Sequence, residues 1–259
     1  MNLAHRTGDI SPENTIWLHS LSEYWEAFID FLQDQNLNEV TDIEKIISVC
    51  QKIERDFSTI IRKTGEPYTA HLYEATRLYI TLHEEQISQK GVIICLLHDN
   101  IEDIGIKEYE EIKSLYGEEI AFCVLILSKP KLQDGESKEE RNIRYNERFE
   151  NISVLQLFVQ EKAQELKIKL SSEELNILTF TIGAIKISDR AHNLITLDLN
   201  HFSLDQVIKK IQETEDYIIP LAQSMGNIFL VDILRKELIK LSTKIHKRKT
   251  EEVLNWKKV

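Results

Sequence analysis

The chain has 259 residues, of which 42% are apolar, 29% charged and 8% aromatic, a composition that places it among soluble globular proteins and excludes disordered and collagen-like classes. Its longest uninterrupted apolar run, from Ile120 to Leu127, is far shorter than the roughly 20 residues needed to cross a bilayer. The net charge of −11 excludes bulk attraction to nucleic acid or to an anionic membrane, and we expect neither as a partner.

Apolar residues recur at the 3.6-residue spacing of amphipathic helices along most of the chain. Start signals include Ser11-Pro12 and a capping box of Thr41 and Glu44, and Gly or Pro marks several helix ends. The apolar run at 92–97 fits a buried strand or a buried helix, and its helical neighbours favour the helix. We expect helices over about 12–32, 43–60, 69–85, 92–97, 107–116, 118–128, 142–170, 171–199, 203–219 and 227–247, with a surface loop at 129–140.

Eight glycines and four prolines leave few residues suited to tight turns, which also favours long helices. The predicted fold is therefore all-α, a single helical domain with almost no strand. Three cysteines stand singly among apolar residues without CxxC spacing, which argues against disulfides and a zinc ribbon and predicts a cytoplasmic location.

The last 27 residues carry nine Lys and Arg against three acids. This local charge of +6 leaves −17 for the remainder. Two interpretations stay open, the solvated face of a last helix and a docking tail for an acidic partner.

A cluster of ionisable residues, His98-Asp99-Asn100-Ile101-Glu102-Asp103, follows the apolar run at 92–97. On a helix, His98 lies one turn from Glu102 and Asp99 one turn from Asp103, so that the four side chains project from neighbouring rows. Carboxylates this close repel one another unless a cation joins them. The cluster therefore predicts a cation site.

A second group, Lys186, Asp189, Arg190 and Asn193, continues the apolar stripe of the predicted helix 171–199. A carboxylate that faces the protein interior needs a partner. Asp189 is therefore expected either to form a buried ion pair with Lys or Arg, or to serve as a metal ligand facing His98 and Asp99. His71, near a predicted helix start, completes a set of two imidazoles and two carboxylates that suits Mn²⁺, Fe²⁺ or Zn²⁺.

Three segments of the sequence resemble the motifs of a known family. Residues 62–68 read RKTGEPY and precede His71, residues 96–103 read LLHDNIED, and residues 185–193 read IKISDRAHN. Together they are similar to the HD-fold hydrolase domain of RelA/SpoT-type enzymes, which cleave the alarmone (p)ppGpp, and the resemblance covers roughly residues 45–240. It implies a single HD-domain helical bundle that acts as a stand-alone small alarmone hydrolase.

The resemblance also implies a role for each matching residue. One Mn²⁺, with Zn²⁺, Fe²⁺ or Co²⁺ as substitutes, would be held by His71, His98, Asp99 and Asp189. The attacking water would be oriented and deprotonated by Glu102 and Asp103. The nucleotide, a guanosine or adenosine polyphosphate, would be contacted by Arg62, Lys63, Lys186 and Asn193.

The expected reaction removes pyrophosphate from the 3′ position of guanosine 3′,5′-bis(diphosphate) or a related alarmone. Two alternatives stay open, an HD-type nucleotidase or phosphohydrolase for another nucleotide and a non-catalytic nucleotide-sensing module. We expect an N-terminal helical extension at 1–40, the hydrolase domain at 41–245 and a basic C-terminal tail at 246–259. The segment 151–170 is interpreted as an insertion, with a surface helix, a lid and an oligomer contact as alternatives, and a homo-oligomer is left open.

Overall fold

A computed structural model gives the structure of the chain and describes residues 21–34, 42–83 and 87–256. This part of the chain contains no β-strand, only an isolated bridge between Ile61 and Pro67. The prediction of an all-α fold is confirmed. The helical elements are α1 (Leu21–Asp34), α2 (Ile43–Asp56), α3 (Tyr68–Leu82), α4 (Gln89–Leu97), η3 (Asn100–Ile104), α5 (Glu108–Tyr116), α6 (Glu118–Leu127), α7 (Lys138–Glu147), α8 (Ile152–Glu165), α9 (Ser172–Ile195), α10 (Leu204–Glu213), η4 (Thr214–Ile218), α11 (Ile219–Ser224) and α12 (Ile228–Trp256).

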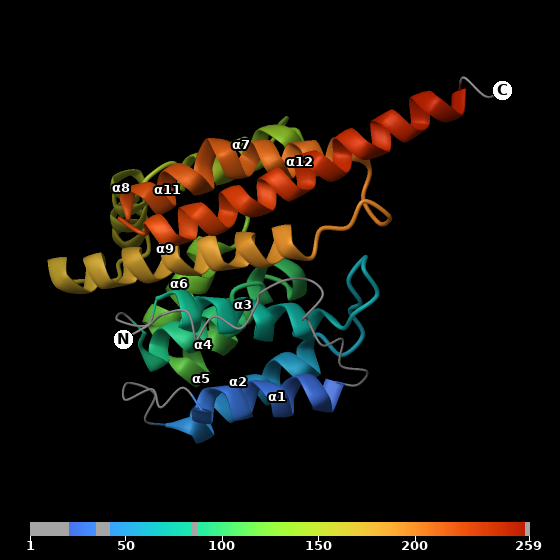
Figure 1. Cartoon of the computed structure of the whole chain (residues 1–259). Coiled ribbons are helices and arrows are strands. Elements are labelled where there is room, and N and C mark those ends of the chain that lie inside the picture. Colours follow the sequence, from blue (N-terminus) through green and yellow to red (C-terminus); the bar gives the residue numbers. More distant parts are fainter. Residues whose placement is uncertain (1–20, 35–41, 84–86, 257–259) are drawn as a thin grey trace.

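Helix α9 is the central element of the bundle. It runs between a lower group of helices that includes α3, α4 and α6 and an upper group that includes α11 and α12, while α1 and α2 form the layer farthest from it (Figure 1). It packs against α3, α8, α12, α6 and α11. Its segment from Thr181 to His192 is buried without interruption, so any polar residue there must find partners inside the bundle.

Several helix boundaries differ from those expected. The side chain that caps α2 is Asp42, which accepts a hydrogen bond from the Lys45 N–H at 3.0 Å; Thr41 lies outside the described residues. The single helix expected over 142–170 is two helices, because Asn151 caps α8 by accepting from the N–H groups of Ser153 and Val154. Helix α7 begins inside the expected loop, at a capping box of Ser137 and Glu140.

Two more boundaries bear on the expected domains. The long helix ends at Ile195 and not near Leu199. Helix α12 continues through the expected basic tail as far as Trp256, and its last turns project beyond the rest of the molecule (Figure 1). The expected extension at 1–40 contains α1, and its residues 1–20 and 35–40 lie outside the described part. The three-part division of the chain stays a prediction.

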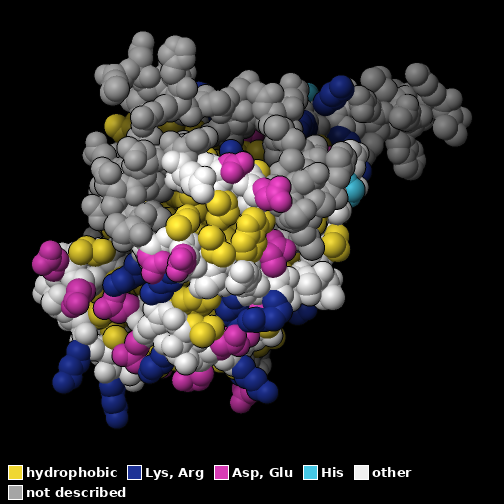
Figure 2. All heavy atoms as spheres, turned by 90° about the horizontal axis from the view of Figure 1, so that it is seen from below, with side chains coloured by type: hydrophobic (Ala, Val, Ile, Leu, Met, Phe, Trp, Pro, Cys, Tyr) yellow, Lys and Arg dark blue, Asp and Glu magenta, His cyan; other side chains and the backbone are white. Residues whose placement is uncertain are grey.

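No helix in the described residues is both long enough and apolar enough to span a membrane. On the face shown in Figure 2, acidic and basic side chains are interspersed around a central group of hydrophobic side chains.

The two short π-helical turns, η3 and η4, each follow the end of a regular helix. Turn η3 comes directly after His98 and Asp99, so these two residues lie in a turn beyond α4 and not within one continuous helix. A π-helical turn inserts an extra residue into the helical repeat, and such turns are frequent at functional sites. The insertion changes the directions of Glu102 and Asp103 relative to His98 and Asp99.

Candidate metal and nucleotide site

A pocket of about 370 Å³ opens where α3, α9, α10 and the turn after α4 meet. Its wall includes every residue that the sequence predicted for the site. These are Arg62, Lys63, His71, His98, Asp99, Glu102, Asp103, Lys186, Asp189 and Asn193.

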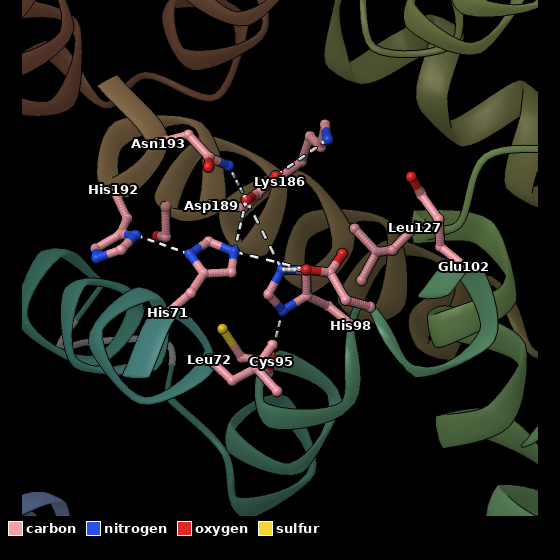
Figure 3. A network of polar contacts seen from close by, with 12 residues as sticks. His71, Leu72, Cys95, His98, Glu102, Leu127, Lys186, Asp189, His192 and Asn193 are labelled. Carbon is pink, nitrogen blue, oxygen red and sulfur yellow. Dashed lines mark hydrogen bonds and ion pairs between the residues drawn. The ribbon is translucent and has the colours of Figure 1, made fainter. Parts of the chain in front are cut away.

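The four predicted metal ligands all line this pocket, and Figure 3 shows His71, His98 and Asp189 close to one another. Nε2 of His71 is 3.3 Å from Oδ1 of Asp189 and 3.6 Å from Oδ2 of Asp99. Nε2 of His98 is 3.2 Å from Oδ2 of Asp99 and 3.7 Å from Oδ1 of Asp189. Residues far apart in the chain thus converge because α3, the end of α4 and α9 pack against one another.

The surroundings of His98 fix the roles of its two ring nitrogens. Its Nδ1 lies 2.7 Å from the carbonyl oxygen of Cys95, which can only accept, so Nδ1 carries the proton. Its Nε2 is buried and has no hydrogen-bond partner in the described structure. An unpartnered imidazole nitrogen that faces two carboxylates fits a divalent cation, and the two-nitrogen, two-carboxylate set suits Mn²⁺, Fe²⁺ or Zn²⁺.

The charges of the cluster shift the pKa values of its members strongly. Burial opposes ionisation of Asp99, but His98 and His71 together outweigh it and hold the pKa of Asp99 well below its ordinary value. The pKa of Asp189 is likewise well below its ordinary value, because Lys186, His71 and His98 outweigh the effect of burial. Burial also opposes the charged form of His98, and Asp99 and Asp189 overcome it and raise its pKa well above the ordinary value, so without a cation Nε2 carries a proton that a bound metal ion would replace. Both carboxylates are therefore ionised, as a metal ligand must be.

Asp189 forms the buried ion pair that its sequence left open, and its second carboxylate oxygen faces the two histidines, so its role as a metal ligand stays a prediction. It pairs with Lys186, whose Nζ lies 3.2 Å from Oδ2, while its Oδ1 faces the two histidines. Nδ2 of Asn193 donates to that same Oδ1 at 2.5 Å, and Oδ1 of Asn193 accepts from Nη2 of Arg62 at 2.9 Å. The predicted nucleotide-binding residue Arg62 is thus joined to a predicted metal ligand through a single amide.

The two residues expected to handle water differ in their surroundings. Glu102 points away from the histidines (Figure 3); it accepts a hydrogen bond from the backbone N–H of Lys129 at 3.0 Å and forms an ion pair with the Lys129 ammonium. Desolvation by the pocket walls and the negative charge of Asp99 raise the pKa of Asp103 to about 6. Asp103, with a pKa near neutrality, has the acid–base properties of a proton-transfer group.

Sequence reasoning missed several residues of the pocket. Tyr68 donates a hydrogen bond of 2.8 Å from its hydroxyl to Oδ2 of Asp99. Lys129 and Lys210 add cationic side chains to the wall, and burial together with the charge of Arg190 lowers the pKa of Lys210 to about 8. The Nζ atoms of Lys186 and Lys129 lie over the ring of Tyr145, at 5.0 and 5.6 Å from the ring centroid.

His192 is also absent from the predicted site, although it lies within the motif at 185–193. Its Nδ1 is 2.7 Å from Nδ1 of His71. Burial and the nearby charges of His71 and Arg62 hold its pKa well below the ordinary value. Lys129, Tyr145 and Lys210 lie outside the three sequence motifs, and only the tertiary structure brings them to the pocket.

Comparison with known proteins gives similarity to enzymes of guanosine polyphosphate metabolism. The chain is 30% identical over 203 residues to a protein of Myxococcus xanthus named GTP pyrophosphokinase, covering 74% of this chain and 23% of the relative. It is 30% identical over 181 residues to the GTP pyrophosphokinase rsh of Brucella ovis, covering 70% of this chain and 20% of the relative.

A third relative is named for the opposite reaction. The chain is 31% identical over 165 residues to the guanosine-3′,5′-bis(diphosphate) 3′-pyrophosphohydrolase of Aquifex aeolicus, covering 64% of this chain and 19% of the relative. No family model matches the chain. The chain spans about a fifth of the length of the curated relatives it matches. Over most of its own length, this chain is therefore similar to one segment of RelA/SpoT-type proteins.

Proposed function

We propose that this protein is a metal-dependent hydrolase of the HD type that removes pyrophosphate from the 3′ position of guanosine 3′,5′-bis(diphosphate) or a close relative. The observation that carries the proposal is the convergence of His71, His98, Asp99 and Asp189 in a pocket whose wall also contains lysine and arginine side chains. A bound divalent cation supplies acidification of a water molecule and compensation of phosphate charge. Mn²⁺ is the proposed ion.

The residues around the four proposed ligands have separate roles in proton transfer and in orienting the ligands. Asp103, with its raised pKa, accepts the proton of the attacking water. Tyr68 holds Oδ2 of Asp99 through its hydroxyl and so orients that carboxylate. Glu102, fixed by the backbone N–H of Lys129, is the second proposed water-handling group and is placed farther from the histidines.

The walls of the pocket fit a substrate with more than one phosphate group. Arg62 and Lys63 lie on the loop before α3, whereas Lys129, Lys186 and Lys210 come from the α6–α7 loop, α9 and α10. These five cations admit a polyanion into a protein whose net charge is −11. The guanidinium plane of Arg62 can stack on a purine, and Asn193 holds its Nη2.

The names of the relatives support the substrate class. All three are enzymes named for guanosine polyphosphates, and the Aquifex aeolicus protein is named for 3′-pyrophosphate hydrolysis. The other two are named for the pyrophosphokinase reaction. The His/Asp cluster favours the hydrolytic direction, because a cation-activated water is a nucleophile for phosphoryl cleavage.

The test is a product assay on ppGpp, pppGpp and ppApp, each with Mn²⁺, with Zn²⁺ and with chelator. We expect pyrophosphate together with the 5′-phosphorylated nucleoside, and no turnover with chelator or in Asp99→Ala. The relative rates on the three substrates identify the base and the number of 5′ phosphates. Release of orthophosphate alone would point to a general nucleotidase, and binding without turnover would point to a sensing module.

A further inference from the structure

The contact between His71 and His192 joins two imidazoles directly. Their Nδ1 atoms are 2.7 Å apart, and both side chains are buried, with 3% and 6% of their surface exposed. The rings are 4.8 Å apart between centroids and tilted by 42°. In Figure 3 the dashed line between them continues the chain of contacts that runs through His71 to Asp189.

A hydrogen bond between two ring nitrogens requires one proton and one lone pair. Either His71 donates and His192 accepts, or the reverse. The other nitrogen of His71, Nε2, faces Asp99 and Asp189. It can bind a cation only when it carries no proton, and a neutral His71 must then carry its proton on Nδ1.

We infer that His192 is a positioning residue that fixes the tautomer of His71 by accepting its Nδ1 proton, an inference that rests on the metal site of the proposed function. His192 must then be neutral, with its own proton on Nε2. Its backbone is held in place for this role, because its carbonyl oxygen accepts from both the N–H and the hydroxyl of Thr196, at 3.0 and 2.9 Å.

His98 supports the same interpretation through an independent contact. The carbonyl oxygen of Cys95 fixes its proton on Nδ1 and leaves Nε2 facing the carboxylates. His192 would accept the Nδ1 proton of His71, as the carbonyl oxygen of Cys95 accepts the Nδ1 proton of His98. Both histidines would then present Nε2 to the same point, and the partner of a ligating histidine typically accounts for 10–100-fold in metal affinity.

Consecutive residues on α9 thereby serve two ligands. His192 orients His71, and Asn193 orients Asp189 by donating to its Oδ1. Because both come from the last turn of the central helix, the geometry of the cluster depends on the position of α9 relative to α3.

The test measures Mn²⁺ affinity directly, by electron paramagnetic resonance of the free ion. His192→Leu removes the acceptor, and we expect the dissociation constant to rise roughly 10–100-fold. His192→Asn places an amide oxygen near the position of Nδ1 and is expected to restore most of the affinity. His83→Leu is the matched control, because His83 is also a buried histidine (6% exposed) but does not line the pocket.

A second measurement uses the unsubstituted chain loaded with diamagnetic Zn²⁺. Nitrogen-15 chemical shifts are expected to show the proton of His71 on Nδ1 and that of His192 on Nε2. A proton on Nδ1 of His192, or unchanged Mn²⁺ affinity in a folded His192→Leu variant, would overturn the inference. Failure of the unsubstituted chain to bind Mn²⁺ would overturn the metal site as well, whereas Mn²⁺ binding without pyrophosphate release would overturn only the proposed reaction.

Discussion

Asn193 donates a hydrogen bond of 2.5 Å from Nδ2 to Oδ1 of Asp189. Its own Oδ1 accepts from Arg62, so one side chain connects the proposed metal site to the proposed nucleotide site. A substitution at Asn193 should therefore affect two properties that are measured separately.

We expect Asn193→Leu to raise the KM for ppGpp roughly tenfold and to weaken Mn²⁺ binding, because Arg62 and Asp189 each lose a hydrogen bond to a charged group, worth about 1.5–3 kcal/mol. Steady-state kinetics and a Mn²⁺ titration measure the two effects. Asn176→Leu, an exposed position on the same helix, is the control. A change in KM with unaltered Mn²⁺ affinity would show that Asp189 does not depend on this amide.

Removal of the metal should lower the thermal stability of the protein. A ligand that binds only the folded state stabilises it by about 2.7 kcal/mol at 100 times its dissociation constant. For a chain of this size that corresponds to a rise in Tm of roughly 5–10 °C. Calorimetry with Mn²⁺ and with chelator measures the difference.

We expect this rise to disappear in Asp189→Asn, since the amide lacks the charge that faces the two histidines. Asp205→Asn, an exposed position at the start of α10, should retain it. An Mn²⁺-dependent rise of the same size in Asp189→Asn would exclude Asp189 as a ligand.

Asp103 should titrate near pH 6 in the metal-free protein. The pocket walls and the charge of Asp99 both favour its neutral form, so Asp99→Asn should lower the pKa of Asp103. Between the ordinary value of about 3.9 and 6, the folded chain holds a proton that the unfolded chain releases. The contribution of Asp103 to stability therefore falls as the pH rises through this window. Carbon-13 NMR of the carboxyl group measures the titration, and a midpoint near 3.9 would contradict the structural explanation.

The fold could be predicted from local patterns, because amphipathic spacing and helix caps are properties of short segments. Asn151 and the Ser137–Glu140 pair are cap signals of the same kind. They divide the segment after residue 137 into α7 and α8, whereas the sequence prediction has one helix over 142–170. The missed boundary between α7 and α8 therefore reflects signals present in the sequence and not a property of the packing.

The candidate site could be predicted from the sequence only in part. The four proposed ligands could be named from the sequence because each lies in or next to a short motif, as do the Asp189 partners Lys186 and Asn193, but the partners of the two histidines could not. His192 meets His71 only because α9 packs against α3, and Tyr145 on α7 reaches the pocket through its contacts with the Leu127 carbonyl and with Lys186. The π-helical turn after Asp99 has no periodic sequence signal, and it directs Glu102 to Lys129 instead of toward His98.

A buried ion-pair network lies behind this π-helical turn. Nζ of Lys52 lies 2.7 Å from Asp56 and 2.6 Å from Glu108, and only 2% of its side chain is exposed. Nδ2 of Asn100, in η3, donates to Oδ2 of Asp56 at 3.1 Å. The network thus connects α2 and α5 to the turn that carries Glu102 and Asp103.

Lys52→Met should lower the free energy of unfolding by about 3–5 kcal/mol, because removal of one partner leaves buried carboxylates without compensation. Lys113→Met is the matched control on α5: it breaks the Lys113–Glu118 pair, whose side chains are 42% and 45% exposed, and exposed pairs contribute little to stability. Urea denaturation at pH 7 compares the two. Because Asn100 depends on Asp56, we also expect Lys52→Met to lower kcat more than it raises KM, whereas Lys113→Met leaves both unchanged. Equal stability losses in the two variants would show that the buried network contributes no more than an exposed pair, and an unchanged kcat in a folded Lys52→Met variant would show that it does not hold the π-helical turn in place.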